Sequence, residues 1–310
     1  MKIYLDHNIL DALSKNRIIL EVPEDTIWVY SDENFKEIKR ANDMRFLDVL
    51  KNLKARKLEL QFDNEFRLTG RALLHKYCEP RDMYQCWLDN INEIHVEDVV
   101  ELQMQYLARL AGANNYNEIL HQPNKLKEFL YNVLSSHDLV TEEMAFQIER
   151  TVENIELIIS SKLLEVQGLD FSRKAIGTDR GRASNLSIKE NPLLLIWEML
   201  GDNHKGMTIK QFYGFEPLDK QGYERWPLYL GIVGCHTVLN FLGFHPDRGL
   251  NCIEKIPSIL SDANHTAMAI YCDAILSMDK KFCAKAHAIF SYLNLDIRVI
   301  EATPNDKASS

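Results

Sequence analysis

The stretch Ser261 to Phe282, SDANHTAMAIYCDAILSMDKKF, contains the pattern that decides the fold. Small and apolar residues recur there with the spacing of one helix face, at Ala263, Ala267 and Ile270. A short, mostly apolar block at 274–278 then ends before Asp279, as in a buried strand. The helix, of about eleven residues at ~1.5 Å each, and the strand, of about five residues at ~3.3 Å each, both cover roughly 16 Å. If they pack antiparallel, Asp262 at the start of the helix would therefore lie near Asp279 at the end of the strand. We therefore predict that these carboxylates lie at the carboxyl edge of an open α/β sheet, where ligands usually bind.

The N-terminus supplies a second strand that ends in aspartate. The hydrophobic run 2–5 leads directly into Asp6, and helical spacing resumes afterwards at Leu10, Leu13 and Ile18. Asp6 is therefore expected at the same sheet edge. Two strands that end in aspartate, together with a helix that begins with one, are a stronger signal than any single aspartate.

Two further strands and a capped helix are predicted before residue 65. Residues 26–30 and 58–62 have strand character, and Ser31 is a good N-cap for a helix through Arg40 that carries Glu37. The apparent sheet-bearing segments are therefore 1–65 and 250–302. We predict that they form one discontinuous α/β domain with a parallel sheet flanked by helices.

The intervening residues 66–249 are predicted to form a mostly α-helical insertion. Apolar spacing, proline at helix starts and glycine at helix ends predict helices at 96–111, 124–135, 141–166, 192–200 and 227–242. The polar tail, 303–310, is expected to be frayed.

Composition excludes several classes of protein. The chain has 310 residues, 46% of them hydrophobic, and a net charge of -9, which disfavours a nucleic-acid coat protein. No apolar run is long enough for a membrane span, and the N-terminus does not resemble a signal peptide, so we expect a cytoplasmic protein with no membrane partner. The six cysteines include no C-x-x-C pair and are expected to be free thiols rather than zinc ligands.

Two stretches are nevertheless locally basic. Residues 36–57 hold eight Lys or Arg against three acids, and residues 171–189 hold five against one. The first could be a solvated helix face, and the second an ordinary solvated loop; both could also contact phosphates. The candidate nucleic-acid contacts are Lys36, Lys39, Arg40, Arg173, Lys174, Arg180 and Arg182.

Four carboxylates would thus surround one point: Asp6, Glu37, Asp262 and Asp279. Ionised together they repel, and a divalent cation would resolve this repulsion. Oxygen ligands favour Mg²⁺ or Mn²⁺, and such ions assist phosphodiester hydrolysis. Each carboxylate also has a plainer interpretation as a helix cap, a turn residue or an ion-pair partner of Lys39 or Arg40. His7 and His265 are weaker candidates for contacts with the substrate or the carboxylates, and Asp273 is expected at the opposite end of the sheet.

The three acidic segments resemble the signature of PIN-domain nucleases. The segments are YLDHNILDAL, SDENFKEI and SDANHTAMAIYCDAILSMDKKF, and the resemblance covers about 65 residues at the N-terminus and about 50 at the C-terminus. The resemblance implies a parallel sheet, an Mg²⁺ or Mn²⁺ site and endonucleolytic cleavage of RNA. By position it implies that Asp6, Glu37, Asp262 and Asp279 are the catalytic metal ligands, supported by Asn8 and Ser277. Small toxin-type members lack the long insertion, which leaves the substrate and any toxin–antitoxin role open.

Other classes of function fit parts of the pattern. A phosphatase or receiver domain also places an aspartate after its first strand, but the phosphatase version has a second aspartate where this chain has Asn8. A catalytically inactive PIN-like module that binds RNA or protein, and a DNA-directed nuclease of the same fold, are the alternatives. The sequence leaves open whether the chain forms a homo-oligomer or binds a regulatory or inhibitor protein.

Overall fold

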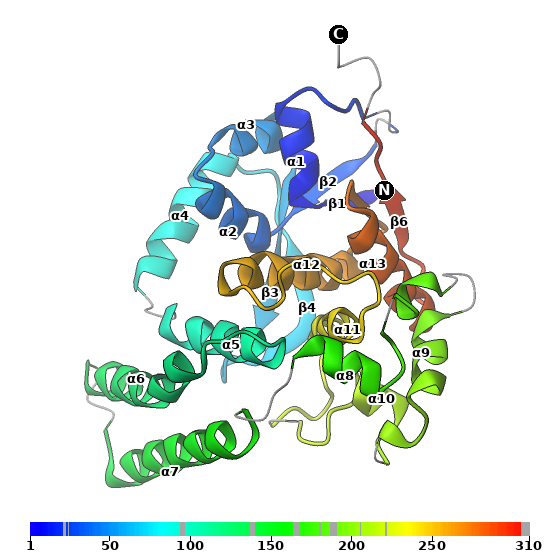
Figure 1. Cartoon of the computed structure of the whole chain (residues 1–310). Coiled ribbons are helices and arrows are strands. Elements are labelled where there is room, and N and C mark those ends of the chain that lie inside the picture. The colour runs from blue at the N-terminus through cyan, green and yellow to red at the C-terminus, as the bar shows by residue number, and fades with distance from the viewer. Residues whose placement is uncertain are drawn as a thin grey trace. The chain divides into compact units, whose positions relative to one another are not determined.

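The computed structural model describes residues 1–20, 23, 25–93, 97–136, 140–163, 168–179, 181–186, 191–204, 206–220 and 222–304. The chain divides into two compact units (Figure 1). Unit 1 comprises Met1–Asp89, Ile176–Asp247 and Leu260–Ser310, and unit 2 comprises Asn90–Ala175 and Arg248–Ile259. Each unit is described separately below.

Unit 1 is built on a six-stranded, mostly parallel sheet. Its strands are β1 (Lys2–Leu5), β2 (Ile27–Tyr30), β3 (Arg56–Phe62), β4 (Leu68–Leu74), β5 (Ala274–Ser277) and β6 (Arg298–Glu301), in the order β4-β3-β2-β1-β5-β6. Only β4 is antiparallel to its neighbour, β3. The carboxyl ends of β1 and β5 are adjacent, because Leu5 pairs with Leu276. Asp6 and Ser277 therefore lie at one edge of the sheet, although they are far apart in sequence.

The central strands β1, β2 and β5 are buried on both faces, as is usual for parallel sheets. On one face, Tyr4, Val29 and Ile275 belong to a core cluster that includes Ile196 of α9 and Ile289 of α13. Ile3 and Leu5 point to the other face and are also buried, since successive strand residues alternate. Figure 1 shows α1, α2 and α3 on this second side.

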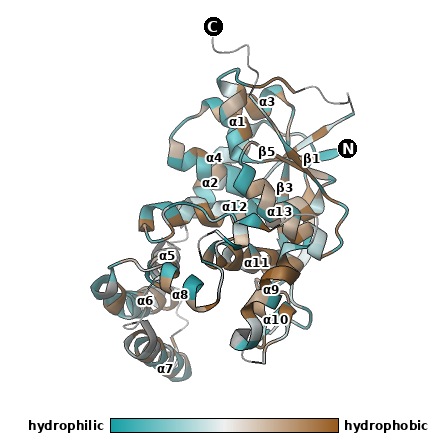
Figure 2. Cartoon of the chain, turned by 45° about the vertical axis from the view of Figure 1, so that its right-hand side comes forward, coloured by the Kyte–Doolittle hydropathy of each residue, from teal (hydrophilic) through white to brown (hydrophobic). Residues whose placement is uncertain are grey.

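The helices of unit 1 connect the strands and cover the sheet. They are α1 (His7–Ser14), α2 (Asp32–Ala41), α3 (Arg45–Asn52), α9 (Pro192–Leu200), α10 (Ile209–Phe212), α11 (Leu228–Leu242) and α13 (Lys280–Tyr292). Helices α4 (Pro80–Glu93) and α12 (Ile256–Met268) contribute residues to both units. Figure 2 shows that α9 and α11 are coloured mainly hydrophobic, which agrees with their burial in the core cluster.

Unit 2 consists of helices α5 (Glu97–Leu110), α6 (Tyr116–Ser136), α7 (Glu142–Ile158) and α8 (Leu169–Ala175), with a π-helical turn at Ile159–Leu163. Buried Ile119 and Ile159 form a small core with Tyr106, Leu110 and Ile155. The hydroxyl of Thr141 accepts a hydrogen bond from the Met144 amide and caps α7.

Most predicted elements are present with the expected bounds, including the α/β class and the strands before Asp6 and Asp279. Ser31 caps α2 through a capping box in which Asn34 returns the hydrogen bond. α11 ends at Gly243, whose φ of 86° suits a residue without a Cβ. The predicted insertion, 66–249, contains helices that the sequence analysis did not place, α4, α8 and α10, and one strand that it did not indicate, β4. Its sequence, LTGRALL, lacks regular alternation and contains a glycine.

Two other local predictions were wrong. Helix α12 begins at Ile256 rather than at Asp262, because Pro257 is tolerated in a first helical turn and does not delay the helix. The stretch 171–189 is not one loop, since Leu169–Ala175 forms α8 and Ala183–Asn185 forms a 3₁₀ turn. Part of this stretch, including Arg180, lies outside the described residues, as does most of the predicted frayed tail.

Two chemical expectations can be compared with the structure. All six cysteines are free, as predicted. Within the described part of the chain, no helix combines the length and apolarity that a bilayer crossing requires.

Candidate functional site

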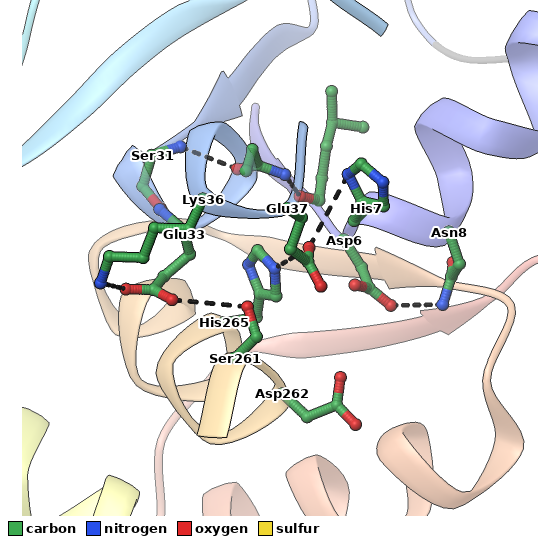
Figure 3. Close-up of polar contacts among 12 residues, drawn as sticks. Asp6, His7, Asn8, Ser31, Glu33, Lys36, Glu37, Ser261, Asp262 and His265 are labelled. Atoms are coloured by element: carbon green, nitrogen blue, oxygen red, sulfur yellow. Dashed lines mark hydrogen bonds and ion pairs between the residues drawn. The ribbon is translucent and has the colours of Figure 1, made fainter. Parts of the chain in front are cut away.

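An acidic cluster lies at the carboxyl edge of the sheet in unit 1, centred on Asp6, which follows β1 (Figure 3). One oxygen of Asp6, Oδ2, accepts a hydrogen bond from Ser277 Oγ at 2.6 Å and another from the Asn8 side-chain amide. Asn8 is itself held by Met278, whose backbone N–H donates to Asn8 Oδ1 at 2.9 Å. Asn8 and Ser277 thus fix the orientation of the Asp6 carboxylate.

The environment of Asp6 disfavours its charge. The pKa of Asp6 is raised to about 6, mainly by burial and also by the nearby Glu37 carboxylate, against the opposing effects of His265 and the Ser277 hydroxyl. The side chain is only 3% exposed. An ionised Asp6 would therefore be stabilised by an additional positive charge.

Glu37, from α2, is held by a chain of hydrogen bonds. His265 Nε2 contacts Glu37 Oε2 at 2.8 Å, and His265 Nδ1 contacts the Tyr4 hydroxyl at 2.8 Å. The Tyr4 hydroxyl also lies 2.6 Å from Ser31 Oγ. Arg40 contacts the other oxygen of Glu37 at 3.2 Å from the exposed side. Both oxygens of Glu37 therefore have cationic or hydrogen-bonding partners.

The register of α2 against α12 brings Glu37 and His265 together. Glu33 and Glu37 are one turn apart on α2, and Ser261 and His265 are one turn apart on α12. Ser261 Oγ donates to Glu33 Oε2 at 3.4 Å, which repeats the Glu37–His265 contact one turn away. His265 was only a weak candidate in the sequence analysis, which did not use the signal available, its i, i+3 spacing from Asp262 on one helix face.

The Glu37–His265 contact behaves as an ion pair. Burial alone would lower the pKa of His265, but Glu37, Asp6 and Glu33 raise it to about 9. Burial would raise the pKa of Glu37, yet His265, His7 and Arg40 bring it below its ordinary value. A protonated His265 donates from both ring nitrogens, so it serves as a counter-charge to the carboxylates.

Asp262 lies on α12, three residues before His265, and Figure 3 shows its carboxylate on the side of Asp6. Burial raises its pKa well above the ordinary value, and the charges of Asp6 and Asp247 raise it further. Among the described residues, no hydrogen bond donor contacts this carboxylate. Asp262 is therefore a helix-interior acid turned into the cluster, and it does not cap a helix.

A buried lysine lies behind Asp262. Lys285 of α13 is fully buried, and its Nζ contacts Asp247 Oδ2 at 2.7 Å and Asn240 Oδ1 at 2.9 Å. The Asp247 backbone N–H also donates to Asn240 Oδ1, at 3.1 Å. Lys285 partly offsets the effect of Asp247 on Asp262. The sequence analysis missed this lysine, although its position three residues after Phe282 and four before Ile289 places it on the buried face of α13.

The structure places Asp279 differently from the other three acids. It is exposed and acts as the N-cap of α13, where its Oδ1 accepts hydrogen bonds from the amides of Lys281 at 2.7 Å and Phe282 at 3.0 Å. Ser277 connects it to the cluster, because the Asp279 amide donates to Ser277 Oγ at 3.0 Å. Asp273 contacts the Lys2 amide at 2.7 Å, at the opposite end of β1, as expected.

The basic candidates are dispersed. Lys36 pairs with Glu33 at 2.5 Å and Arg40 with Glu37 at 3.2 Å, while Lys39 is exposed. Arg173 and Lys174 belong to α8 in unit 2, whereas Arg182 is an exposed residue of unit 1. The predicted basic loop is thus divided between two units.

Three residues of the cluster could together hold a metal ion. Ligand atoms of Asp6, Glu37 and His265 all lie within 4.8 Å of one another, which is close enough to share one ion. Because both nitrogens of His265 already contact Glu37 and Tyr4, carboxylate oxygens are the available ligands. Oxygen ligands of this kind suit Mg²⁺, Mn²⁺ or Ca²⁺ better than softer metals. Comparisons with protein-family models, with curated proteins and with solved structures found no match to this chain.

Proposed function

We propose that this chain is a PIN-like, Mg²⁺- or Mn²⁺-dependent endoribonuclease. The observation that carries the proposal is the buried group of Asp6, Glu37 and His265, whose ligand atoms lie within 4.8 Å of one another, together with Asp262, whose pKa is raised in part by the charge of Asp6. Burying several acids together is costly unless a cation is bound among them. The parallel sheet and the position of Asp6 after β1 support the same proposal.

Each residue of the cluster would have a definite task. Ser277 and Asn8 hold one oxygen of Asp6 and leave the other directed at the cluster. His265 orients Glu37, and Asp262 completes the ligand set from α12. Bound there, Mg²⁺ or Mn²⁺ would activate water and stabilise the charge that develops on the phosphate during hydrolysis. Arg40, which is exposed and pairs with Glu37, is one of the proposed phosphate contacts.

One observation favours a second candidate function, a PIN-like module that binds RNA or protein without cleaving it. The Glu37 carboxylate is already neutralised by His265 and Arg40, so part of the cluster is stable without a metal ion. In that case Asp6 and Asp262 would be protonated or weakly repelling rather than metal ligands.

Asp262→Asn distinguishes these two functions. The substitution removes one charge from the cluster, so the metal-free protein should be as stable as the wild type or more so. Loss of a metal ligand should slow cleavage of a mixed RNA pool by about a hundredfold or more, which corresponds to roughly 2.7 kcal/mol or more of transition-state stabilisation. The measurement is cleavage with Mg²⁺, with Mn²⁺ and with a chelator, alongside thermal melting under each condition.

Asp273→Asn is the matched control, because Asp273 is an exposed aspartate at the opposite edge and should leave cleavage unchanged. A DNA pool run in parallel separates the two nuclease alternatives. Full cleavage by Asp262→Asn, or a wild-type melting temperature that is indifferent to saturating Mn²⁺, would contradict the metal site and favour the binding module.

A further inference from the structure

The β3–β4 hairpin extends beyond the rest of the sheet on the side of the acidic cluster. β2 pairs with β3 only at Arg56 and Lys57, while β3 continues to Phe62. The five residues after Lys57 add about 16 Å at ~3.3 Å per residue. Because β3 is parallel to β2 and β1, this extension leaves the sheet at its carboxyl edge. The end of the hairpin is therefore on the same side as Asp6.

A bulge shapes the extended part of the hairpin. Leu60 pairs with Ala72 and Phe62 with Leu68, so β4 has two extra residues between these pairs. Gly70 within the bulge has a φ of 76°, and a Cβ there would contact nothing within 4 Å. Bulges redirect side chains and are frequent next to functional sites. Beside the bulge lies a cavity of about 520 Å³ that is open to solvent and lined by Gln61, Phe62, Thr69 and Arg71.

The hairpin is anchored, so this cavity does not depend on a loose segment. Leu68, Ala72 and Leu74 pack against the core of unit 1. The Leu68 amide donates to the Tyr223 hydroxyl at 3.1 Å, and Thr69 Oγ1 donates to the Gln61 carbonyl at 3.0 Å. The cavity is within the range of about 300 to 1,000 Å³ that is usual for small-ligand pockets.

The side chains that line the cavity match the chemistry of a nucleotide. Phe62 is 57% exposed, a high value for an aromatic ring, and offers a stacking surface. Gln61 offers an amide donor and acceptor for a base edge. The acids of the hairpin are already paired, Asp63 and Glu65 with Arg67 and Glu59 with His75. Within the described residues Arg71 has no carboxylate partner, which leaves its charge for a phosphate.

We propose that this cavity binds one nucleotide of the single-stranded RNA whose backbone is cleaved at the acidic cluster. The base stacks on Phe62 and its edge contacts Gln61, while Arg71 contacts a phosphate. The proposal rests on the proposed function for the choice of RNA. It adds a subsite away from the scissile bond, and this subsite determines how the strand is aligned.

Binding in the presence of a chelator tests this subsite apart from cleavage. The probe is a dye-labelled single-stranded RNA of about a dozen nucleotides, and the full chain is titrated by fluorescence anisotropy. Phe62→Ala should weaken binding by about tenfold or more at every salt concentration, since base–aromatic stacking is sequence-tolerant and strong. Phe62→Trp should restore it. Arg71→Ala should weaken binding and reduce the slope of log K against log salt by about 0.7.

Phe146→Ala and Arg150→Ala are matched controls, because both residues are exposed on α7 and should leave binding unchanged. Wild-type affinity in both Phe62→Ala and Arg71→Ala would overturn the subsite, even if the wild type cleaves RNA. A Phe62→Ala protein that changes from dimer to monomer with unaltered RNA binding would also overturn it and assign the hairpin to a contact between copies. Subsite-dependent RNA binding without any cleavage would contradict only the nuclease.

Discussion

The pair Asp6–Asp262 and the pair Glu37–His265 lie in one acidic cluster, but they differ in how buried charge is neutralised. Glu37 has a bonded cation, since His265 Nε2 lies 2.8 Å from its carboxylate, and the pKa of Glu37 falls below its ordinary value. Asp6 and Asp262 have no bonded cation among the described residues. Burial raises the pKa of both.

This difference indicates which carboxylates of the cluster a bound cation would stabilise most. The Glu37 side of the cluster is stable as folded, whereas the Asp6–Asp262 side holds negative charge that only distant groups offset. Lys285 does not neutralise Asp6 or Asp262, because its ammonium is bonded to Asp247. A metal ion bound between Asp6 and Asp262 would therefore be stabilised more by these two residues than by Glu37.

The largest expected effect concerns Lys285, the one fully buried lysine of the described residues. Lys285→Met leaves the partly buried Asp247 without its cation, and the charge of Asp247 already acts on Asp262. Breaking a buried pair in this way costs about 3–5 kcal/mol. Chemical denaturation should show this loss, whereas Lys280→Met, at a lysine 82% exposed, should change the free energy of unfolding by less than about 1 kcal/mol.

A double variant separates charge from packing at this position. Lys285→Met combined with Asp247→Leu removes both charges and should recover most of the stability. If Lys285→Met is as stable as the wild type, Lys285 is not the counter-charge of Asp247. The contrast between the Asp6–Asp262 and Glu37–His265 pairs would then have less support.

The second expected effect is a pH dependence specific to His265. Its folded-state pKa is raised from 6.5 to about 9 by Glu37, Asp6 and Glu33, so the stabilisation is complete below pH 6.5 and is lost as pH rises toward 9. The shift corresponds to a contribution on the order of 3 kcal/mol. In metal-free buffer, the difference in unfolding free energy between wild type and His265→Gln should therefore shrink between pH 6.5 and 9. A constant difference across this window would show that His265 is neutral in the folded protein.

The third effect tests where the metal ion binds. A ligand present at a hundred times its Kd stabilises the folded state by about 2.7 kcal/mol, so Mn²⁺ should raise the melting temperature of the wild type. Asp6→Asn should lose most of this rise, because it removes one of the two unneutralised acids. His265→Gln should retain most of it. If Asp6→Asn keeps the Mn²⁺-induced rise and His265→Gln loses it, the metal ion binds on the Glu37 side of the cluster instead.

The sequence predicted those elements whose local residue pattern matches the place that the element takes in the folded protein. The strands before Asp6 and Asp279 are short apolar runs, and Ser31 and Gly243 have the capping chemistry that their helices use. Strand β4 was missed because its pairing depends on the two-residue bulge around Gly70, which no local alternation reveals. The start of α12 was misplaced because Asp262 is also a plausible capping residue by type.

The candidate site could be predicted in part. Strand ends predicted that Asp6 and Asp279 share an edge, but partner choice across 228 positions, as between Glu37 and His265, depends on how two helices are aligned. The burial of Lys285 is likewise a property of tertiary packing. Spacing along one helix shows which face a residue occupies, and it does not show what lies opposite.

The smallest effect concerns Asp279, which contrasts with Asp6 and Asp262 because its carboxylate is exposed and already used as a helix cap. Asparagine caps about as well as aspartate, so Asp279→Asn should melt like the wild type, while Asp279→Ala should lose about 0.5–2 kcal/mol. If the cap is its main role, Asp279→Asn should also retain cleavage within about tenfold, against the hundredfold loss expected for Asp262→Asn.

The resemblance to PIN-domain nucleases implies instead that Asp279 is a ligand, and the same variant distinguishes the two roles. A wild-type melting temperature combined with a hundredfold loss of cleavage in Asp279→Asn would mean that charge, and not capping, is what the reaction needs at this position. Only Oδ1 of Asp279 accepts the amides of Lys281 and Phe282, so its second oxygen could still join a metal ion while the cap is kept. Retained cleavage would restrict the ligand set to the buried acids that the sheet edge, α2 and α12 bring together.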